Sequence, residues 1–233
     1  MDPPPGPTGF RSELRAALRR TVATRSRRWL LAVTLLLGVL AAGAVLAGTP
    51  PERRTFAGLA EQVQLLMSVP VPFIGALLTG DLRRSAGTAR RAPTVLAALL
   101  VAVAVGAYGV LVGAGALALA PSGGAPDAWR YAGTIALGGL LVQVVAQFVG
   151  TGAGLVLRPF PVAALATVVL PLGLWLLLGA VDVLRPAQEW LTPYANARHL
   201  LSGEMSALRR AQCLTVLLLW AALPHTLARP RRP

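Results

Sequence analysis

Long apolar stretches alternate with short polar segments along this chain of 233 residues. A run of about 18 or more apolar residues is long enough to cross the hydrocarbon core of a bilayer as a helix. Six stretches meet this condition, and we expect each to be a membrane-spanning helix: residues 29–48, 59–80, 94–120, 131–157, 160–181 and 211–228. The pattern predicts an all-α, polytopic membrane protein.

The segment before the first stretch has a different pattern. Every fourth position from 10 to 22 is apolar: Phe10, Leu14, Leu18 and Val22. An arginine directly follows each of the first three: Arg11, Arg15 and Arg19. This spacing predicts an amphipathic helix that lies along the membrane surface, where snorkelling arginines meet anionic lipids. Such a helix serves either as an interfacial anchor alone or also as a contact for a cytoplasmic partner. The first stretch is longer than the apolar core of a signal peptide, so we interpret it as an uncleaved anchor.

Composition supports the membrane assignment, since 55% of the residues are hydrophobic, 13% are charged and the mean hydropathy is +0.63. All 22 basic residues are arginines. Four of them stand in the segment LLTGDLRRSAGTARRAP, residues 77–93, between the second and third stretches. Burying four arginines in the bilayer centre would cost on the order of 10 kcal/mol, so this segment must lie in water or at the headgroups.

The distribution of arginines predicts the orientation. With both termini in the cytoplasm, fifteen arginines lie inside and seven outside, which satisfies the positive-inside rule. The expected organisation is a cytoplasmic tail with its amphipathic helix at 1–28, a six-helix transmembrane domain at 29–228 and a cytoplasmic tail at 229–233. The longest polar segment, about 182–210, is then outside. Within it, Thr192 and Pro193 signal a helix start and Ser202 and Gly203 a stop, which predicts a short helix near the membrane surface before the sixth span.

The polar residues do not indicate catalysis. None of the nine acidic residues lies deep in a span, and His199 and His225 fall on opposite sides of the membrane. Cys213 lies in an apolar segment, and the absence of lysine excludes a P-loop. We expect no catalytic, cofactor-binding or metal-binding residue in this chain, so any ATP hydrolysis belongs to another subunit. Dispersed arginine clusters without interleaved aromatic residues also argue against nucleic acid as a partner.

A few polar side chains fall within the predicted spans. Gln143, Gln147 and Thr151 recur at i+4 spacing, which fits either hydrogen bonds between helices, which we favour, or the lining of a transport path. Residues at the outer end of the second span fit either an outward vestibule or a solvated helix end: Glu61, Gln62 and Gln64.

Small residues and prolines predict how the spans pack. Two GxxxG pairs, Gly109 with Gly113 and Gly150 with Gly154, permit close helix contact within one subunit. Three prolines remove backbone donors and are expected to kink the second and fifth spans: Pro70, Pro72 and Pro171.

The order of these parts resembles the permease subunits of type V ABC exporters, the ABC-2-type membrane-spanning subunits. It shares a basic amphipathic helix, six spans, a charged cytoplasmic loop after the second and short outer helices before the sixth. The motifs that carry the resemblance are an acidic residue followed by Gly-Thr and a proline (Asp81, Gly87, Thr88, Pro93) and PYANARHLLSG near the sixth span. The family usually has glutamate where Asp81 stands.

The resemblance implies a subunit that couples ATP hydrolysis to solute export without being an enzyme itself. The charged loop would form a coupling helix in a groove of a separate ATPase subunit that binds ATP and Mg²⁺, through Asp81, Arg83, Arg84, Gly87, Thr88, Arg90 and Arg91. The segment 190–203 would form part of an outer gate, with Trp190, Tyr194, Arg198 and His199. A homodimer or a paired homologous permease would enclose the path.

Two alternatives stay open. The four arginines in the charged loop could act as topology signals alone. The chain could also be a standalone membrane immunity or scaffold protein that recruits no ATPase. The all-arginine, alanine-rich composition is typical of a GC-rich, actinobacterium-like source, which places the chain in a bacterial plasma membrane.

Overall fold

The computed structural model describes residues 7–84, 91–120, 124–222 and 226, and this part of the chain consists of helices joined by short connections. A 3₁₀ turn follows α2 (Pro51–Arg53), another follows α7 (Asp182–Leu184), and a π-helical turn extends α10 (Leu218–Ala222). The helices are α1 (Pro7–Thr21), α2 (Arg25–Gly48), α3 (Phe56–Met67), α4 (Val71–Arg84), α5 (Arg91–Ala118), α6 (Ala132–Val156), α7 (Phe160–Ala180), α8 (Ala187–Leu191), α9 (Pro193–Leu201) and α10 (Ala207–Leu217).

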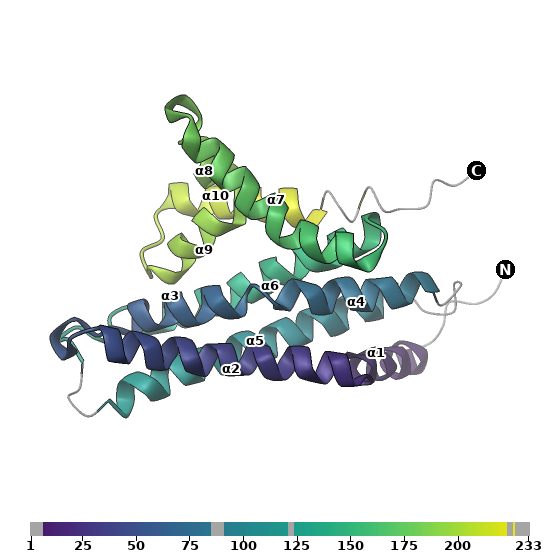
Figure 1. Ribbon diagram of the computed structural model, residues 1–233, viewed down its shortest axis with the longest axis horizontal. Helices are drawn as coiled ribbons and strands as arrows, with labels where there is room; N and C mark the ends of the chain where they lie inside the picture. The colour runs from purple at the N-terminus through teal and green to yellow at the C-terminus, as the bar shows by residue number, and fades with distance from the viewer. Residues whose placement is uncertain (1–6, 85–90, 121–123, 223–225, 227–233) are drawn as a thin grey trace.

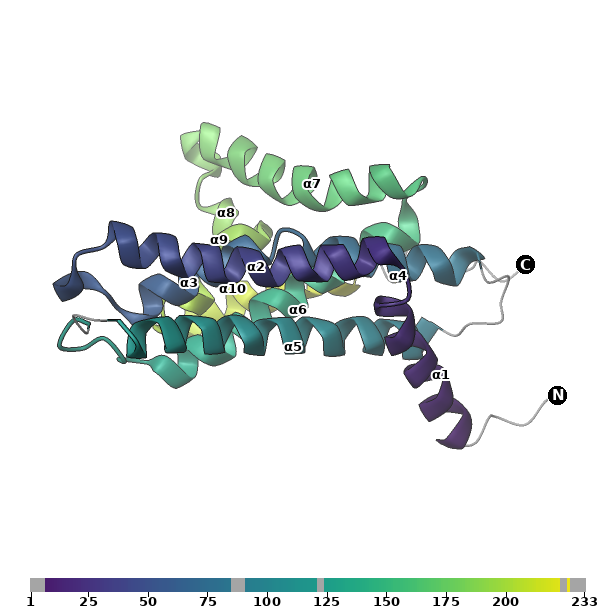
Figure 2. The ribbon, with the colours of Figure 1, turned by 60° about the horizontal axis from the view of Figure 1, so that its bottom comes forward.

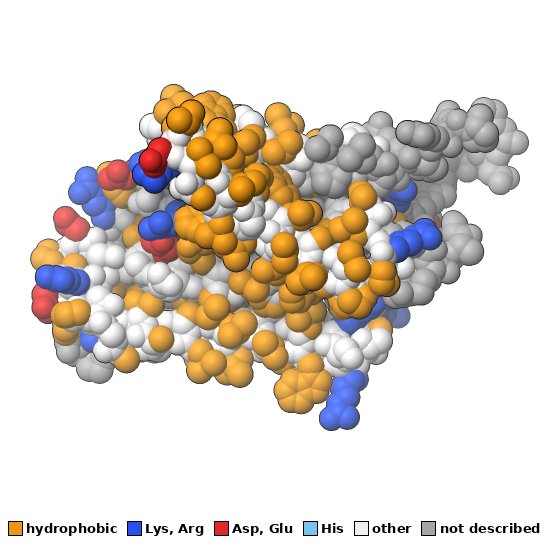
Figure 3. All heavy atoms as spheres, turned by 45° about the horizontal axis from the view of Figure 1, so that its top comes forward, with side chains coloured by type: hydrophobic (Ala, Val, Ile, Leu, Met, Phe, Trp, Pro, Cys, Tyr) orange, Lys and Arg blue, Asp and Glu red, His pale blue; other side chains and the backbone are white. Residues whose placement is uncertain are grey.

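Five segments among the described residues are long and apolar enough to cross a membrane. They are α2, the combined segment Phe56–Leu82, α5, α6 and α7, and they coincide with the first five predicted spans to within a few residues. Figure 3 shows hydrophobic side chains across the middle of one face, with charged side chains toward its ends. These features indicate a multi-pass membrane protein.

The helices form two layers (Figure 1). The first layer is a bundle of α2, α3 with α4, α5 and α6, whose members pack against one another and enclose the main apolar core. The second layer consists of α7 to α10 and contacts the bundle through α6, α4 and α3. In Figure 1, α7 runs obliquely to the axis of the bundle. Helix α6 therefore lies between the two layers and has a face toward each.

The predicted amphipathic helix forms α1. Figure 2 shows that it turns away from the direction of α2 at one end of the bundle, as a helix along a membrane surface would. It packs against α5 and α4 through the fully buried Ala17 and through Thr21. Phe10 and Val22, at the two ends of the predicted apolar face, remain 38% and 48% exposed. The helix therefore keeps apolar surface available beyond what the bundle covers.

Prolines interrupt the second span as the sequence predicts. Helix α3 ends at Met67 and α4 begins at Val71, with Ser68 as the C-cap of α3. Pro70 and Pro72 have no backbone N–H to continue the ladder of hydrogen bonds, so the helix stops and restarts. Pro171 has a milder effect, because α7 continues through it.

Glycines bring α4 and α6 into close contact. A Cβ atom at Gly150 would overlap the backbone of Pro72, and one at Gly154 would overlap Thr79 and Ala76. Gly109 of the other GxxxG pair faces the side chain of Gln64 on α3. Both pairs thus serve packing within this one chain, because small residues let neighbouring backbones approach.

The predicted sixth span differs from the other five. It falls on α10 and the π-helical turn that continues it, which together run from Ala207 to Ala222. This segment is not among the five that are long enough to cross the membrane, and residues 223–225, 227 and 228 lie outside the described part of the chain. The described residues therefore establish five candidate spans rather than six.

Candidate functional site

A buried ion pair joins three helices at the end of the bundle predicted to be cytoplasmic. Arg27, in the first turn of α2, pairs with Asp81 near the end of α4. The Arg27 side chain is 8% exposed and that of Asp81 22% exposed. A second guanidinium nitrogen, Nη1 of Arg27, donates a hydrogen bond to the carbonyl oxygen of Arg20 on α1 at 2.6 Å. One side chain thus connects α1, α2 and α4.

The helix start around Arg27 fixes its position. Thr24 is the N-cap of α2, and its Oγ1 accepts a hydrogen bond from the backbone N–H of Arg27 at 3.3 Å. A guanidinium removed from water needs an opposite charge and further acceptors, and Asp81 with the Arg20 carbonyl supplies them. Sequence analysis predicted no role for Arg27 beyond topology. The signals in the sequence were that Arg27 lies just before the first apolar stretch and that Asp81 directly follows the second.

The rest of the predicted coupling segment is described in part. Arg83 and Arg84 are the last residues of α4, and Arg91 is the exposed first residue of α5. Gly87, Thr88 and Arg90 lie outside the described residues. Asp81 belongs to α4 and is turned toward α2. Pro93, two residues into α5, is buried.

Glutamines hydrogen-bond three helices of the bundle together. Nε2 of Gln64 on α3 donates to the carbonyl oxygen of Gly106 on α5 at 2.9 Å. Nε2 of Gln143 on α6 donates to both the backbone and side-chain oxygens of Gln64, each at 2.9 Å. Both side chains are fully buried. Gln64 is therefore neither in a vestibule nor at a solvated helix end, and Gln143 links helices.

Gln147 differs from Gln143 although it lies one helical turn away. It is fully buried, yet within the described part of the chain neither its Oε1 nor its Nε2 has a hydrogen-bond partner. Thr151, the third polar position, donates its hydroxyl to the carbonyl oxygen of Gln147 at 3.0 Å. The contacts of Gln143 with Gln64 and of Gly150 with Pro72 place Gln147 at the level of the interruption between α3 and α4.

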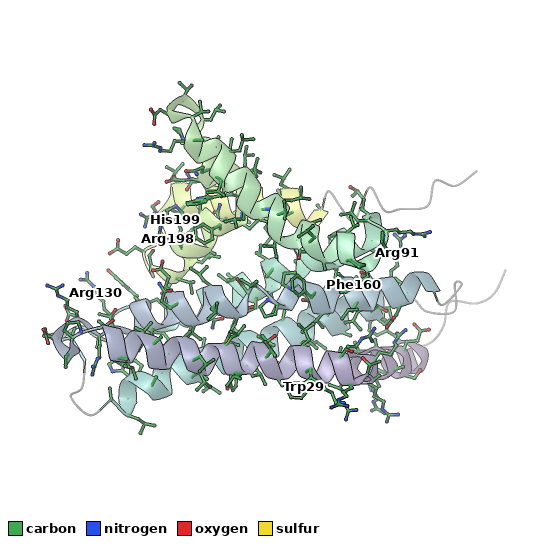
Figure 4. All side chains as sticks on the ribbon, viewed as in Figure 1. Trp29, Arg91, Arg130, Phe160, Arg198 and His199 are labelled. Atoms are coloured by element: carbon green, nitrogen blue, oxygen red, sulfur yellow. The ribbon has the colours of Figure 1, made fainter. Side chains whose placement is uncertain are left out.

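The predicted gate segment makes one ion pair and one histidine–carboxylate contact at the opposite end. Figure 4 shows Arg198 and His199 on α9, toward the end that carries Arg130, and Arg91 toward the other end. Nε of Arg198 lies 3.0 Å from Oε1 of Glu61 on α3, and Nε2 of His199 lies 3.8 Å from Oε1 of Glu189. Burial lowers the pKa of His199, with repulsion from Arg209 and Arg198 adding to the effect and Glu189 opposing it.

The other residues of this segment hold α8 and α9 against their neighbours. Tyr194 packs edge-on against Trp175 of α7, with ring centroids 5.0 Å apart. Trp190 is 36% exposed, and Gln62 on α3 is exposed as well. The predicted helix start is correct: Thr192 Oγ1 caps α9 by accepting from the N–H of Ala195 at 3.4 Å.

Helix α9 packs more deeply than a surface helix. Leu200 and Leu201 are buried, and the carbonyl of Leu200 comes so close to Gly138 on α6 that a Cβ atom there would overlap it. Gly203, at φ 77°, adopts the left-handed conformation that ends the helix and turns the chain toward α10. Gly138 was the signal in the sequence for this contact, whereas its neighbour Gly139 faces Gln64 on α3.

A cavity of about 590 Å³ separates part of α6 from the second layer. We call it the lateral cavity. The interruption between α3 and α4 forms one end of its wall, and α6, α7, α9 and α10 form the rest. Its walls are apolar apart from a few side chains, among them Ser68, Thr167, Tyr194, Asn196 and Arg210.

Among the described residues, no three His, Cys, Asp or Glu side chains group together to hold a metal ion. The arrangement offers an ion-paired junction of helices and an apolar cavity, which suit mechanical coupling and the binding of an apolar molecule. Comparisons with family models, with curated proteins and with solved structures found no significant match.

Proposed function

We propose that this chain is the membrane-spanning permease subunit of an ATP-driven ABC exporter. A separate ATPase subunit that binds ATP and Mg²⁺ would dock at the end of the bundle where α1, α2 and α4 meet. The observation that carries the proposal is the pairing of Arg27 with Asp81 and with the carbonyl of Arg20. A force applied to α1 or to the end of α4 would pass directly to α2 through this contact.

The remaining parts fit this role. Helix α10, continued beyond Ala222, would supply the sixth span, and α8 and α9 would be the short outer helices before it. Six spans enclose no wide path, so two such subunits, identical or homologous, would face each other across it in a bacterial plasma membrane. Both termini would then be cytoplasmic.

The mechanism would be rigid-body coupling. ATP binding would bring the two ATPase subunits together and tilt the segment around Asp81, Arg83, Arg84 and Arg91. The ion pair would carry this motion to α2, while the interruption at Ser68–Pro70 would let α4 change its angle to α3. The permease would switch between inward and outward exposure without covalent chemistry.

A reconstitution experiment tests the proposal. The chain would be co-expressed with a P-loop ATPase encoded beside it in its source genome, purified in mild detergent and placed in lipid nanodiscs. We expect the ATPase to co-purify and its ATP hydrolysis to depend on the permease. The substitutions Arg27→Gln and Asp81→Asn should each reduce this hydrolysis at least tenfold, because each breaks the link between α4 and α2.

The double exchange Arg27→Asp with Asp81→Arg should restore part of the activity, because it rebuilds the charge pair. Arg53→Ala provides a matched control, since Arg53 is an exposed arginine at the other end of α2. It should leave hydrolysis unchanged. If no ATPase accompanies the intact chain, the exporter proposal fails and the standalone scaffold or immunity protein becomes the better interpretation.

A further inference from the structure

The lateral cavity has the dimensions of a ligand site. Its volume of about 590 Å³ lies within the range of roughly 300–1,000 Å³ that small-molecule sites occupy. The walls facing it from α6 are Leu141, Val142, Val145, Ala146 and Val149. An apolar space of this kind does not hold ordered water. If the cavity were empty, the atoms of its walls would lose dispersion contacts. An apolar occupant would recover these contacts.

One positive charge lies in the cavity wall without an acidic partner. Arg210 is exposed in the first turn of α10, and within the described part of the chain it forms no ion pair. Glu204, the acid nearest to Arg210 in the sequence, forms no ion pair with it among the described residues. Glu61 pairs with Arg198, and Glu189 accepts a hydrogen bond from Nε2 of Gln212. The first turn of α10 contains no acidic residue, and the positive end of the helix adds to the charge of Arg210.

The side chain of Asn196 forms a buried part of the wall of the lateral cavity. Nδ2 of Asn196 donates to the carbonyl oxygens of Glu189 and Thr192, at 2.6 and 3.1 Å, and the side chain is 3% exposed. Its Oδ1 has no hydrogen-bond partner among the described residues. Asn196 therefore joins α9 to α8 behind the cavity wall, and Arg210 is the charged group of the wall.

We propose that the lateral cavity binds one acyl chain of an anionic phospholipid from the surrounding bilayer, with its phosphate at Arg210. The cavity lies between α6 and α7, two helices that are long and apolar enough to cross the membrane, so lipid chains are its natural neighbours. The guanidinium of Arg210 matches a phosphate in charge and in hydrogen-bonding geometry. The lipid site does not depend on the coupling of an ATPase.

The chain carries its own reporter for this site. Cys213, one turn from Arg210 on α10, lines the lateral cavity and is the only cysteine in the sequence. The full chain would be placed in nanodiscs of phosphatidylglycerol or of phosphatidylcholine, and the rate of its reaction with N-ethylmaleimide would be measured. We expect the reaction to be at least about threefold slower in phosphatidylglycerol, because the bound chain covers the thiol.

Three variants make the result specific. Arg210→Gln should abolish the difference between the two lipids, and Ala146→Phe should slow the reaction equally in both because it fills the cavity. Arg53→Gln, which removes an exposed arginine away from the cavity, should leave the difference intact. Equal rates in the two lipids for the unaltered chain would overturn the proposal.

A second thiol controls for general effects of surface charge. In a Cys213→Ser chain, Leu165→Cys places a thiol on the exposed face of α7, where Leu165 is 64% exposed. Its reaction should not show the threefold difference, and the same slowing at this thiol would overturn the proposal. Palmitate added to phosphatidylcholine nanodiscs separates the sources of the ligand. If palmitate protects Cys213 and phosphatidylglycerol does not, the phospholipid assignment is wrong.

Discussion

The two faces of α6 are built in opposite ways. The face toward α3, α4 and α5 carries Gln143, Gln147 and the glycines at 150 and 154, and it packs with direct contacts between backbones. The face toward α7, α9 and α10 meets α9 closely at Gly138, but farther along the helix it carries mostly branched apolar side chains and leaves the lateral cavity of about 590 Å³. One helix thus has a close-packed interface and a hollow one.

The difference follows from the solvent. Within a bilayer the hydrophobic effect does not drive helices together, because lipid tails are as apolar as the side chains. Helices therefore associate through close packing and hydrogen bonds between polar side chains. The bundle face of α6 has both. The opposite face has bulky side chains but few polar bonds across it, so lipid competes with protein for the same surface. Four sets of substitutions would break or sharpen this contrast.

The largest effect is expected from Gly150→Leu. A side chain at Gly150 would overlap the backbone of Pro72, which cannot move aside without separating α4 from α6. We expect the stability to fall by about 3 kcal/mol or more, since overpacking against backbone leaves no relaxed alternative. The measurement is the apparent Tm in detergent. Gly173→Leu on α7 is the matched control, because nothing lies within 4 Å of a Cβ atom there. Equal losses for the two variants would contradict the contrast.

The paired substitutions Gln143→Leu and Gln147→Leu come second. Gln143→Leu removes two hydrogen bonds to Gln64 and leaves the buried Oε1 of Gln64 unpaired, while the backbone oxygen of Gln64 still accepts from the N–H of Ser68, so the expected cost is about 1–2 kcal/mol. Gln147→Leu removes no hydrogen bond present among the described residues, so its stability should equal or exceed that of the unaltered chain. Thermal unfolding of both variants in the same detergent makes the comparison. A larger loss for Gln147→Leu would show that this amide has a partner.

The third-largest change in stability is expected from substitutions at two alanines, one at each face of α6. Ala76 on α4 is 1% exposed and packs against Gly154, whereas Ala146 lines the lateral cavity. Ala76→Leu should destabilise the bundle, while Ala146→Leu should leave stability unchanged or raise it by up to about 1 kcal/mol through cavity filling. The apparent Tm of each variant in lipid-free detergent is the measurement. A loss with Ala146→Leu would mean that the cavity is not available to a side chain.

The smallest effect is the pH dependence of stability that His199 on α9 contributes. The pKa of His199 is lowered in the folded chain, chiefly by burial, so the unfolded chain binds a proton more readily. The stability due to the neutral imidazole is therefore present above the ordinary histidine pKa of about 6.5 and is lost as the pH falls below it. His199→Gln should reduce the fall in Tm between pH 7 and pH 5. An unchanged fall would exclude His199 as its source.

Much of the fold follows from local sequence. The lengths of the apolar runs determine five spans, Thr192 and Pro193 locate the start of α9, and Pro70 and Pro72 locate the interruption of the second span. Each of these features depends on residues close together in the chain. The predicted sixth span has the same kind of signal, but its described part ends at Ala222 after a π-helical turn.

Contacts between distant residues could not be predicted in the same way. Gln143 and Gln64 are 79 residues apart, and Arg27 and Asp81 are 54 residues apart. Nothing in either local pattern identifies its partner, because any polar residue at the right depth would satisfy a buried amide or guanidinium. The lateral cavity is harder still to predict from the sequence, since it depends on how α7 and α9 are placed relative to α6.

The interruption at Ser68–Pro70 means that the second span consists of two rods with a joint between them. Gln64 attaches the first rod, α3, to α5 and α6 by its amide, whereas the second rod, α4, is attached to α2 by the ion pair of Asp81 with Arg27. Because the prolines have already removed backbone hydrogen bonds at the joint, a change in the angle between the rods would break few others. A push on α4 would therefore be absorbed at Ser68–Pro70 before it reached α3.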